Sequence, residues 1–439
     1  MFLEKIITDE RGIKMGKAFV KSATPREIKT EENLRKTVSS IIQDVIQNKD
    51  QAVLKYNQKF DNNSREMFRV TKEEIQNAYK KVSASLIEDM KVAHQNIEKF
   101  AKAQLETINQ PLETEVIPGA FLGHKKIPVE SVCCYVPGGY YPLFSTALML
   151  ATPAKVAGVK RIIACSPPAN GTTSIHPSTL VALDLAGVDE IYTVGGVQAV
   201  AAATYGTEQI KNTALIVGPG NQYVTEAKRQ CYGKIGIDFI AGPSEVLILA
   251  DETANPKFLA ADLLAQSEHD KNAKGILITT HRETAENTVQ EIKTILQTLS
   301  TKEIAEVSWE KNGEIIVVDT IEEGIILTNE IAPEHLEIIV KDSIENHVIE
   351  QLTNYGALFI GGLSAEVFGD YVSGTNHTLP TIGAPRYTGG LWVGTFIKTC
   401  TYQKFTPEGI HALAPIAERM GYAEGLHAHA LAARARFNE

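Results

Sequence analysis

The sequence predicts an α/β protein with two open, mostly parallel-sheet α/β domains, a helical N-terminal part and small C-terminal elements. From about residue 132, short β-branched or apolar runs alternate with helical segments, and many of the runs end at glycine or proline. This alternation is typical of βαβ units, in which helices cover both faces of a parallel sheet. The runs are too many for one ordinary sheet, so we expect two. The predicted strands are Val132–Val136, Arg161–Cys165, Glu190–Val194, Ala214–Val217, Val246–Ala250, Gly275–Thr279, Glu314–Val318, Glu337–Val340 and Ala357–Ile360.

The first hundred residues have helical spacing and no strand-like alternation. They are rich in Lys, Glu and Gln, and the run Thr71-Lys72-Glu73-Glu74 has the form of a capping box at a helix start. Apolar residues then recur at intervals that largely suit one helical face. They are Ile75, Tyr79, Val82, Met90, Ile97 and Phe100. We expect this region to be helical packing or dimerisation scaffold without chemistry of its own.

These patterns divide the chain into four predicted parts. We expect residues 1–30 to form a helical arm, and residues 31–131 together with 237–380 to form a first α/β domain. Residues 132–236 form the second α/β domain. Residues 381–439 form a C-terminal tail that is too small to bury a core of its own, so it should pack on another domain or another subunit.

Composition and charge exclude several classes of protein. The chain has 439 residues, of which 44% are hydrophobic, so it has enough apolar side chains to fill globular cores. Its 43 Lys and Arg against 53 Asp and Glu give a net charge of −10, which argues against nucleic acid or an anionic membrane as a partner. The most hydrophobic region, residues 141–159, is interrupted by Pro142, Pro153 and Lys155, so we expect no membrane span. The N-terminal residues lack the apolar run of a secretory signal, so export is not expected.

The cysteines indicate a reducing compartment. They form an odd set without a CxxC pair, which fits neither a disulfide framework nor a thiolate zinc site. They are Cys133, Cys134, Cys165, Cys231 and Cys400. We therefore expect the protein to be cytoplasmic.

Several glycine-rich loops follow predicted strands. In open α/β sheets the ligand binds beyond the carboxyl ends of the strands, so these loops are candidate contacts. None matches the usual G-x-G-x-x-G dinucleotide fingerprint, and each could equally be a plain strand-to-helix turn. The loops are Pro137-Gly138-Gly139, Gly195-Gly196 followed by Gln198, and Gly218-Pro219-Gly220-Asn221.

Metal-type side chains gather in the C-terminal half of the chain. Gln266 and His269 are spaced i, i+3 and would share a helical face. Imidazole nitrogens with carboxylate or amide oxygens suit zinc or a similar divalent ion, although any one of these histidines could instead be an ordinary hydrogen-bonded residue. The other candidates are Glu334, His335, Asp370, His377, Glu424, His427 and His429.

Glu334 and His335 are adjacent titratable groups just after Pro333. Such a pair can divide general acid and base work between them, if the surroundings bring both pKa values toward neutrality. The alternative is a helix N-terminus at which a glutamate is favoured by the helix dipole. Ser244 is a candidate polar ligand contact; a nucleophilic role is the weaker option, because no G-x-S-x-G context surrounds it.

Taken together, the motifs give the chain a resemblance to the histidinol dehydrogenase family over nearly its whole length. The matching segments are YVPGG, VGGVQA, GPGNQYVTEAKRQ, AGPSE, LLAQSEHD, APEHLE, GDYVSGTNHTLPT and EGLHAHA. The resemblance implies a zinc-dependent, NAD-linked cytoplasmic enzyme that works as a homodimer and makes L-histidine from L-histidinol. In this reading the first α/β domain holds much of the metal site, and the second carries the NAD-binding loops.

The resemblance also assigns residues to roles, motif by motif. The zinc ligands that it implies, one ion per subunit, are Gln266, His269, Asp370 and His429. The substrate contacts are Ser244, His335, His377 and Glu424, with the zinc ligands beside them. The NAD contacts are Tyr135, Gln198 and Asn221. Because the tail lacks a core of its own, we expect His429 and Glu424 to complete the active site of the other subunit.

The mechanism implied by the resemblance is a four-electron oxidation in two steps. His335 acts as the base on the alcohol, and Glu334 activates water to attack a bound L-histidinaldehyde, with one NAD consumed in each step. Three alternatives remain open from the residues alone: a zinc hydrolase that needs no NAD, an enzyme that oxidises another amino alcohol, and a two-lobed binding protein without catalysis.

Overall fold

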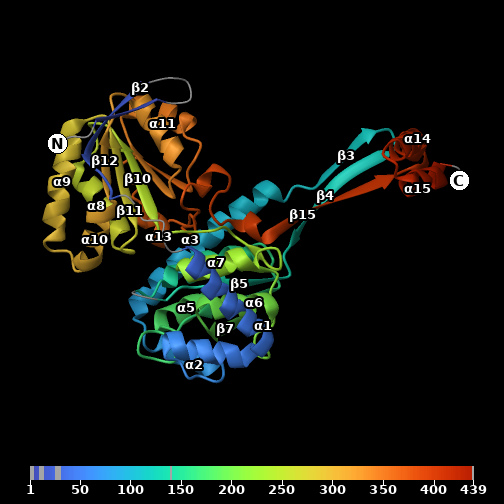
Figure 1. The fold of residues 1–439 in the computed structure, drawn as a ribbon, viewed down its shortest axis with the longest axis horizontal. Helices are drawn as coiled ribbons and strands as arrows, with labels where there is room; N and C mark the ends of the chain where they lie inside the picture. The colour runs from blue at the N-terminus through green and yellow to red at the C-terminus, as the bar shows by residue number, and fades with distance from the viewer. Residues whose placement is uncertain (1–3, 9–13, 25–30, 139–140, 438–439) are drawn as a thin grey trace.

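The computed structural model describes residues 4–8, 14–24, 31–138 and 141–437. These residues form two α/β lobes and an arm that projects away from both (Figure 1). The five-stranded lobe comprises residues 31–108, 129–138 and 141–241. The seven-stranded lobe comprises residues 4–8, 14–24 and 242–391. The arm comprises residues 112–128 and 397–437.

The five-stranded lobe contains a wholly parallel sheet of order β7-β6-β5-β8-β9. Its strands are β5 (Ser131–Tyr135), β6 (Arg161–Ser166), β7 (Glu190–Thr193), β8 (Leu215–Val217) and β9 (Gly236–Ile237). The crossover helices are α4 (Phe144–Val156), α5 (Pro177–Leu185), α6 (Gly196–Tyr205) and α7 (Gln222–Cys231). Both faces of the sheet are buried: Val132 and Cys134 belong to one core, and Cys133 and Tyr135 belong to the other. This explains why the strand sequences are uniformly apolar.

Three N-terminal helices complete this lobe. They are α1 (Glu31–Asp61), α2 (Lys72–Tyr79) and α3 (Ala84–Ile108). α2 begins with the predicted capping box, in which Thr71 and Glu74 hydrogen-bond each other's backbone N–H groups. α1 packs on α6 and α7, whereas α2 and α3 pack on α5 and α4. Our assignment of this helical region to the domain of residues 237–380 is therefore wrong, because a helix's own periodicity shows which face is buried but not which sheet buries it.

The seven-stranded lobe has the strand order β1-β2-β12-β11-β10-β13-β14. Its strands are β1 (Glu4–Thr8), β2 (Lys14–Lys21), β10 (Glu245–Ala250), β11 (Lys274–Thr279), β12 (Glu314–Val317), β13 (His335–Ile339) and β14 (Ala357–Ile360). β10 to β14 are parallel, whereas β2 is antiparallel to both β1 and β12. The helices are α8 (Pro256–Ser267), α9 (Arg282–Leu296), α10 (Lys302–Asn312), α11 (Ile321–Ile331), α12 (Asp342–Gln351) and α13 (Glu366–Tyr371).

The prediction of a helical arm over residues 1–30 is wrong for the described part of that segment. Residues 4–8 and 14–21 are the strands β1 and β2. β2 pairs with β12, whose outer edge would otherwise leave backbone N–H and C=O groups unpaired. That requirement comes from a strand some three hundred positions away, so the local sequence did not contain it.

The arm is a three-stranded antiparallel sheet that carries two helices at its tip (Figure 1). It consists of β3 (Leu112–Ile117), β4 (Ala120–Pro128), β15 (Ile397–Phe405), α14 (Pro407–Ala423) and α15 (His427–Phe437). The two helices pack on each other through few buried residues, among them Ala414 and Ala430. We did not predict these strands. β3 and β4 form a local hairpin around Pro118-Gly119 that the sequence analysis missed, whereas β15 finds its partner β4 far away in the chain.

The predicted α/β class is confirmed, and each predicted strand is present with its ends shifted by at most two residues. Within the described residues, no helix is both long enough and apolar enough to cross a bilayer. The cysteines are free thiols, and Cys400 alone among them is exposed.

Candidate active site

The acid and base candidates meet at the amino ends of two neighbouring strands. β10 and β13 are parallel partners, with Val246 opposite His335, so Glu334 and Glu245 lie side by side. We expected the site at the carboxyl ends of the strands, and for this lobe that prediction is wrong. The reason is that α8 runs back from the carboxyl end of β10 and delivers Gln266 and His269 to the amino edge.

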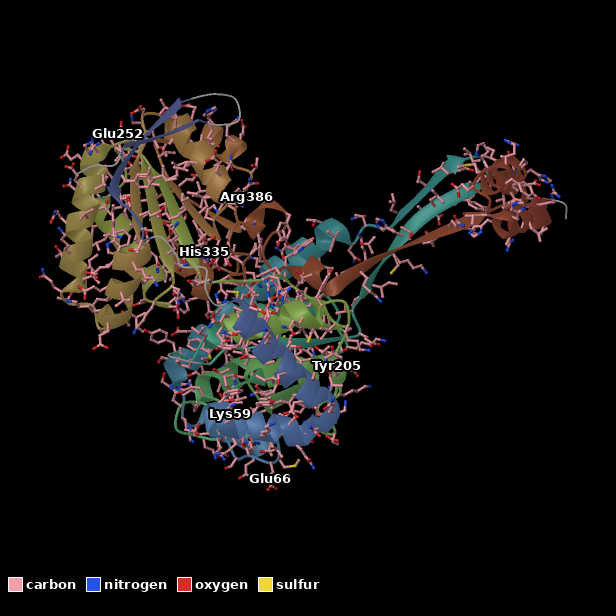
Figure 2. The ribbon with its side chains drawn as sticks, viewed as in Figure 1. Lys59, Glu66, Tyr205, Glu252, His335 and Arg386 are labelled. Atoms are coloured by element: carbon pink, nitrogen blue, oxygen red, sulfur yellow. The ribbon has the colours of Figure 1, made fainter. Side chains whose placement is uncertain are left out.

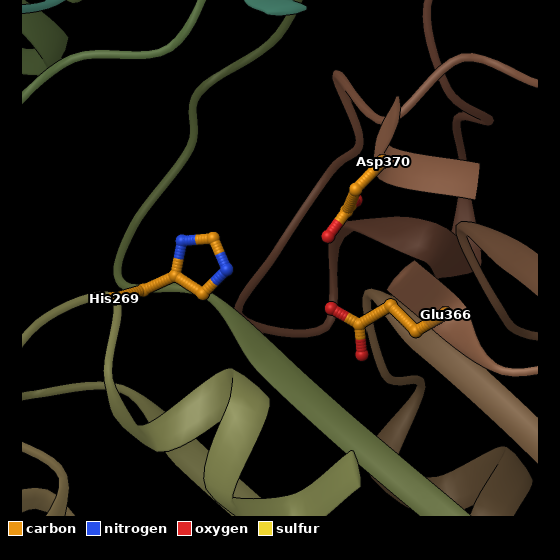
Figure 3. Close-up of side chains that lie close together, drawn as sticks. All are labelled: His269, Glu366 and Asp370. Carbon is orange, nitrogen blue, oxygen red and sulfur yellow. The ribbon is translucent and has the colours of Figure 1, made fainter. Parts of the chain in front are cut away.

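A short helix brings two carboxylates to the same edge. α13 carries Glu366 and Asp370, spaced i, i+4 on one helical face, and both point toward His269 (Figure 3). One ligand atom from each of these three residues lies within 4.8 Å of the others. Sequence reasoning found His269 and Asp370 but missed Glu366. The spacing of Glu366 and Asp370 was the signal that could have found it.

This cluster fits a divalent metal ion. An imidazole nitrogen with two carboxylates is a donor set that zinc accepts. Burial raises the pKa of Asp370 to about 6 and that of Glu366 well above its ordinary value, so without a cation the two carboxylates are costly to ionise together. Glu366 Oε2 is buried and has no hydrogen-bond partner among the described residues. A cation at this position would satisfy that oxygen and favour both ionised forms.

Gln266 is fully buried beside the cluster. When its amide nitrogen faces Glu366, the nitrogen donates to Oε1 at 2.9 Å, and the amide oxygen accepts from the Glu245 N–H at 2.7 Å. The backbone of Glu366 is fixed by β13, because the Glu366 N–H donates to Glu337 Oε1 at 2.8 Å. The strand β13 therefore supports both the catalytic candidates and the metal cluster.

His335 is held so that one ring nitrogen remains free. Its Nδ1 lies 3.2 Å from the Glu245 carbonyl oxygen, and a nitrogen facing a carbonyl must donate, which leaves the Nε2 lone pair available. Nε2 is buried and has no partner among the described residues. Burial lowers the pKa of His335 to about 3, so the imidazole is neutral at pH 7. A neutral imidazole with a free lone pair can accept a proton.

Glu334 is the second buried acid–base group. Its Oε2 accepts from the Glu245 N–H at 2.9 Å and lies 3.7 Å from His335 Nδ1. Burial raises the pKa of Glu334 well above its ordinary value, and hydrogen bonds from Glu245 and the Ser244 side chain oppose that shift. A raised pKa brings the carboxyl toward the range in which it can exchange a proton near neutral pH. Glu334 precedes a strand, so the alternative of a helix N-terminus does not hold.

His377 joins the seven-stranded lobe to the other lobe. Its Nδ1 donates to the Asp370 carbonyl oxygen at 2.9 Å, and its Nε2 lies 3.4 Å from Thr146 Oγ1 on α4. Its neighbour Asn376 donates from Nδ2 to the Met149 carbonyl oxygen at 2.7 Å. α4 begins just beyond the carboxyl end of β5, so the carboxyl edge of the five-stranded sheet faces the amino edge of the seven-stranded sheet.

The three NAD-contact candidates lie at that carboxyl edge. Tyr135 ends β5, and its hydroxyl accepts from the Gly196 N–H at 3.1 Å. Gln198 is fully buried on α6; its Nε2 donates to Asn57 Oδ1 at 3.2 Å, while its Oε1 has no partner among the described residues. Asn221 caps α7, accepting from the backbone N–H of Tyr223 and Val224 at 3.0 and 3.2 Å.

The glycine loops at this edge pack too tightly for side chains. A Cβ at Gly138 would lie 2.7 Å from the Pro167 ring, and a Cβ at Gly195 would lie 2.6 Å from it. The backbone after β5 and the backbone after β7 therefore both pack directly against the proline ring that follows β6. Gly139, the last residue of the first loop, lies outside the described residues. The orphaned amide atoms of Gln198 and Asn57, together with these bare loops, fit a ligand with many polar atoms such as a dinucleotide.

Glu424 and His429 do not join the cluster within one chain. Both are exposed at the tip of the arm, on the C-cap of α14 and on α15, whereas His335 lies in the seven-stranded lobe (Figure 2). The tip also exposes large apolar side chains. They are Ile416, Met420, Tyr422, Leu426 and Leu431.

Comparisons with known proteins agree with these motifs. The profile of the histidinol dehydrogenase family matches residues 24–437. A histidinol dehydrogenase of Bacillus cereus (strain ATCC 14579) is 44% identical over 409 residues, which cover 93% of this chain and 94% of that protein. A protein of Shouchella clausii named histidinol dehydrogenase homolog is 47% identical over 396 residues, which cover 90% and 92%. The crystal structure of histidinol dehydrogenase from Elizabethkingia anophelis superposes with a TM-score of 0.89 at 41% identity and covers 94% of each chain.

Proposed function

Because the chain belongs to the histidinol dehydrogenase family, whose members are NAD-dependent dehydrogenases, we propose that it oxidises L-histidinol to L-histidine with two NAD and one zinc ion per subunit. The observation that carries this proposal is the free, buried Nε2 of His335 beside the cluster of His269, Glu366 and Asp370. Four electrons leave the substrate as two hydrides, and water supplies the second carboxylate oxygen.

A zinc ion would be held by Gln266, His269 and Asp370, together with His429 of a second subunit, with the Glu366 carboxylate beside these ligands. When bound, zinc orients the imidazole and amino groups of the substrate, which can contribute several kcal/mol by restricting the reactants. Glu366 Oε1 accepts from the Gln266 amide nitrogen at 2.9 Å and so fixes the orientation of that amide. Ser244 and His377 of the same subunit contact the substrate. Glu424 of the second subunit also contacts it.

His335 and Glu334 divide the proton transfers. In the first step, His335 Nε2 takes the alcohol proton while the Glu245 carbonyl stabilises the ring through Nδ1. In the second step, Glu334 takes a proton from the water that attacks the bound L-histidinaldehyde.

Tyr135, Gln198 and Asn221 bind NAD at the facing edge of the five-stranded sheet. NAD supplies the hydride acceptor for each step. The contacts of Asn376 and His377 with α4 hold the two edges in register, so that the substrate carbon and the nicotinamide ring meet between the lobes.

The active unit is a homodimer in which the arm of each subunit completes the site of the other. The exposed apolar residues at the arm tip need a partner surface, and a groove beside α13 offers one with exposed Phe100, Leu363 and Phe368. A mixed dimer of His335→Ala and His429→Ala subunits tests the exchange. In each mixed dimer one of the two sites then contains both intact residues, so an equal mixture in which half of the dimers are mixed should regain about a quarter of the native activity if sites are shared. Metal-replete monomers with native turnover would overturn this part of the proposal.

The decisive experiment counts NADH against histidine. Purified, zinc-loaded protein is given L-histidinol and excess NAD, and both products are measured at completion. We expect two NADH for each histidine. A folded, zinc-loaded sample that produces no NADH would overturn the proposal. We also propose that this reaction takes place in the cytoplasm as the last steps of histidine biosynthesis.

A second candidate is the oxidation of a different amino alcohol. It is favoured by one observation, that the Shouchella clausii relative at 47% identity is named only a homolog. Comparison of kcat/KM for L-histidinol with that for amino alcohols lacking the imidazole ring separates the two. A preference for histidinol of tenfold or more, about 1.4 kcal/mol in transition-state binding, supports the first candidate.

A further inference from the structure

A buried ion pair contacts Gly218, the first residue of the loop that carries Asn221. It has no role in the chemistry described above. Lys228 of α7 and Asp238, just after β9, have side chains that are 3% and 0% exposed. A buried ion pair contributes little net stability, because desolvation offsets most of the attraction. Its position is therefore better explained by what the two groups hold.

The pair holds both backbone polar groups of one glycine. Lys228 Nζ donates to the Gly218 carbonyl oxygen at 2.9 Å and also to Asp238 Oδ1. Asp238 Oδ2 accepts from the Gly218 N–H at 2.7 Å, and its Oδ1 accepts from the Phe239 N–H at 2.8 Å. Charge-assisted bonds of this kind are about twice as strong as neutral ones.

Gly218 stands where two of the proposed NAD contacts meet. It directly follows β8, has a φ of +119°, and a Cβ on it would lie 2.2 Å from the Tyr135 carbonyl oxygen. Three residues later, Asn221 caps α7, and Thr225 ties that helix to the Ala241 carbonyl oxygen at 2.9 Å. Fixing Gly218 therefore fixes the path of the loop to Asn221.

We propose that Lys228 and Asp238 are positioning residues for NAD, which act by holding the Gly218–Asn221 loop in its binding conformation before NAD arrives. The proposal rests on the proposed function, because it takes this loop to be part of the NAD site. A loop that is already ordered loses less conformational entropy when the ligand binds.

The same sheet supplies a matched control pair. Arg161 and Glu190 form an ion pair at the amino ends of β6 and β7, with Nε to Oε1 at 2.8 Å. Arg161 Nη1 also donates to the carbonyl oxygens of Lys211 and Asn212. This pair likewise holds a loop, but at the edge opposite the proposed NAD site.

The test replaces each pair with apolar residues, so that no unpaired charge stays buried. The variants are Lys228→Met with Asp238→Leu, and Arg161→Met with Glu190→Leu as the control. We measure zinc content, the Kd of NAD by calorimetry, the KM of NAD and of L-histidinol, and kcat. We expect the first variant to raise the Kd and KM of NAD by about tenfold or more, while zinc content, the KM of L-histidinol and kcat at saturating NAD stay near native. The control variant should leave NAD binding unchanged.

An NAD affinity within twofold of native in the first variant would overturn the proposal, and so would an equal loss in the control. Wild-type protein that does not bind NAD at all would instead overturn the proposed function, so the two failures are distinguishable.

Hydrogen exchange on the unaltered protein gives a second measurement if the double variant does not fold. We expect the segment of residues 215–224 to be as protected in the NAD-free enzyme as β5, and to gain little protection when NAD is added. Rapid exchange that becomes slow only with NAD would overturn the proposal, because the loop would then be ordered by the ligand.

Discussion

The two lobes present opposite edges of their sheets to the same space. In the five-stranded lobe the glycine loops follow the carboxyl ends of the strands, where open α/β sheets usually bind ligands. In the seven-stranded lobe Glu334 and His335 stand at the amino end of β13, and α8 and α13 return their metal-type residues to that edge. The usual rule therefore agrees with one half of the proposed site and not with the other half.

The two edges also differ in the groups that they offer. The five-stranded edge offers backbone and amide groups, with a glycine wherever a Cβ would collide. The seven-stranded edge offers buried carboxyls and imidazoles whose pKa values are displaced by burial, such as Asp370 and His335. Substitutions at the two edges should therefore affect different measured constants, and the following predictions test that separation.

The largest effect is expected for His269→Ala. This change removes a proposed zinc ligand, so bound zinc should fall close to zero and kcat should fall by about 10³ or more, because the metal's contribution of several kcal/mol is lost. Metal analysis and turnover measure this, and the Kd of NAD should remain near native. Full zinc content with native turnover would contradict the assignment, and a parallel loss of NAD binding would show that the two edges are not separate.

His335→Ala should lower kcat by about 10² to 10⁴, the range for losing a general base. Zinc content should stay native, because His335 is not a ligand in the proposed site. Glu334→Gln provides the companion: we expect it to impair oxidation of added L-histidinaldehyde more than oxidation of the alcohol. Turnover of His335→Ala within a few-fold of native would exclude His335 as the base.

Gly218→Ala tests the five-stranded edge. A Cβ at this φ is strained and would lie 2.2 Å from the Tyr135 carbonyl oxygen, so the loop must shift. We expect the KM of NAD to rise by about tenfold while zinc content and the KM of L-histidinol remain native. Gly171→Ala is the control, because Gly171 also has a positive φ (+74°) but its Cβ meets no atom within 4 Å. An equal effect of both changes would place the cause in general backbone strain.

The smallest effect concerns Asp61, a carboxyl of the five-stranded lobe that lies outside the proposed chemistry. Burial raises the pKa of Asp61 to about 6, above its unfolded value. Its protonated form therefore favours the fold at low pH, and that contribution is lost as the pH rises through about 6. Asp61→Asn should be more stable than wild type to urea at pH 8, and the difference should vanish near pH 4. A difference that is independent of pH would contradict the shift.

Much of the fold was predictable from residue order alone. The apolar runs located the parallel strands, and the capping box located the start of α2, because both features depend on neighbours in the chain. The candidate zinc, substrate and NAD residues came from the resemblance of several separated motifs to one family. Among these, the structure brings Gln266, His269 and Asp370 to one edge, beside Glu334 and His335.

Other features could not be predicted from local pattern. The helices α1 to α3 pack on the five-stranded sheet, and β1 and β2 extend the edge of the other sheet. The spacing of Glu366 and Asp370 is a local signal, but only the tertiary structure brings both carboxylates beside His269. In each case the deciding partner is a surface formed elsewhere in the chain.

The sequence by itself determined the parallel strands after residue 130, the capped start of α2 and the residue types available for chemistry, because these depend on side chains a few positions apart. Only the tertiary structure decided which edges meet. Thr146 and His377 are 231 positions apart, yet their contact faces one sheet's carboxyl edge toward the other's amino edge. It also decided that Glu424 and His429 lie at the tip of an arm, because β15 pairs with β4 along its full length and carries α14 and α15 away from both lobes (Figure 1). Such pairings follow from the burial and hydrogen bonding of whole surfaces, which no short segment contains.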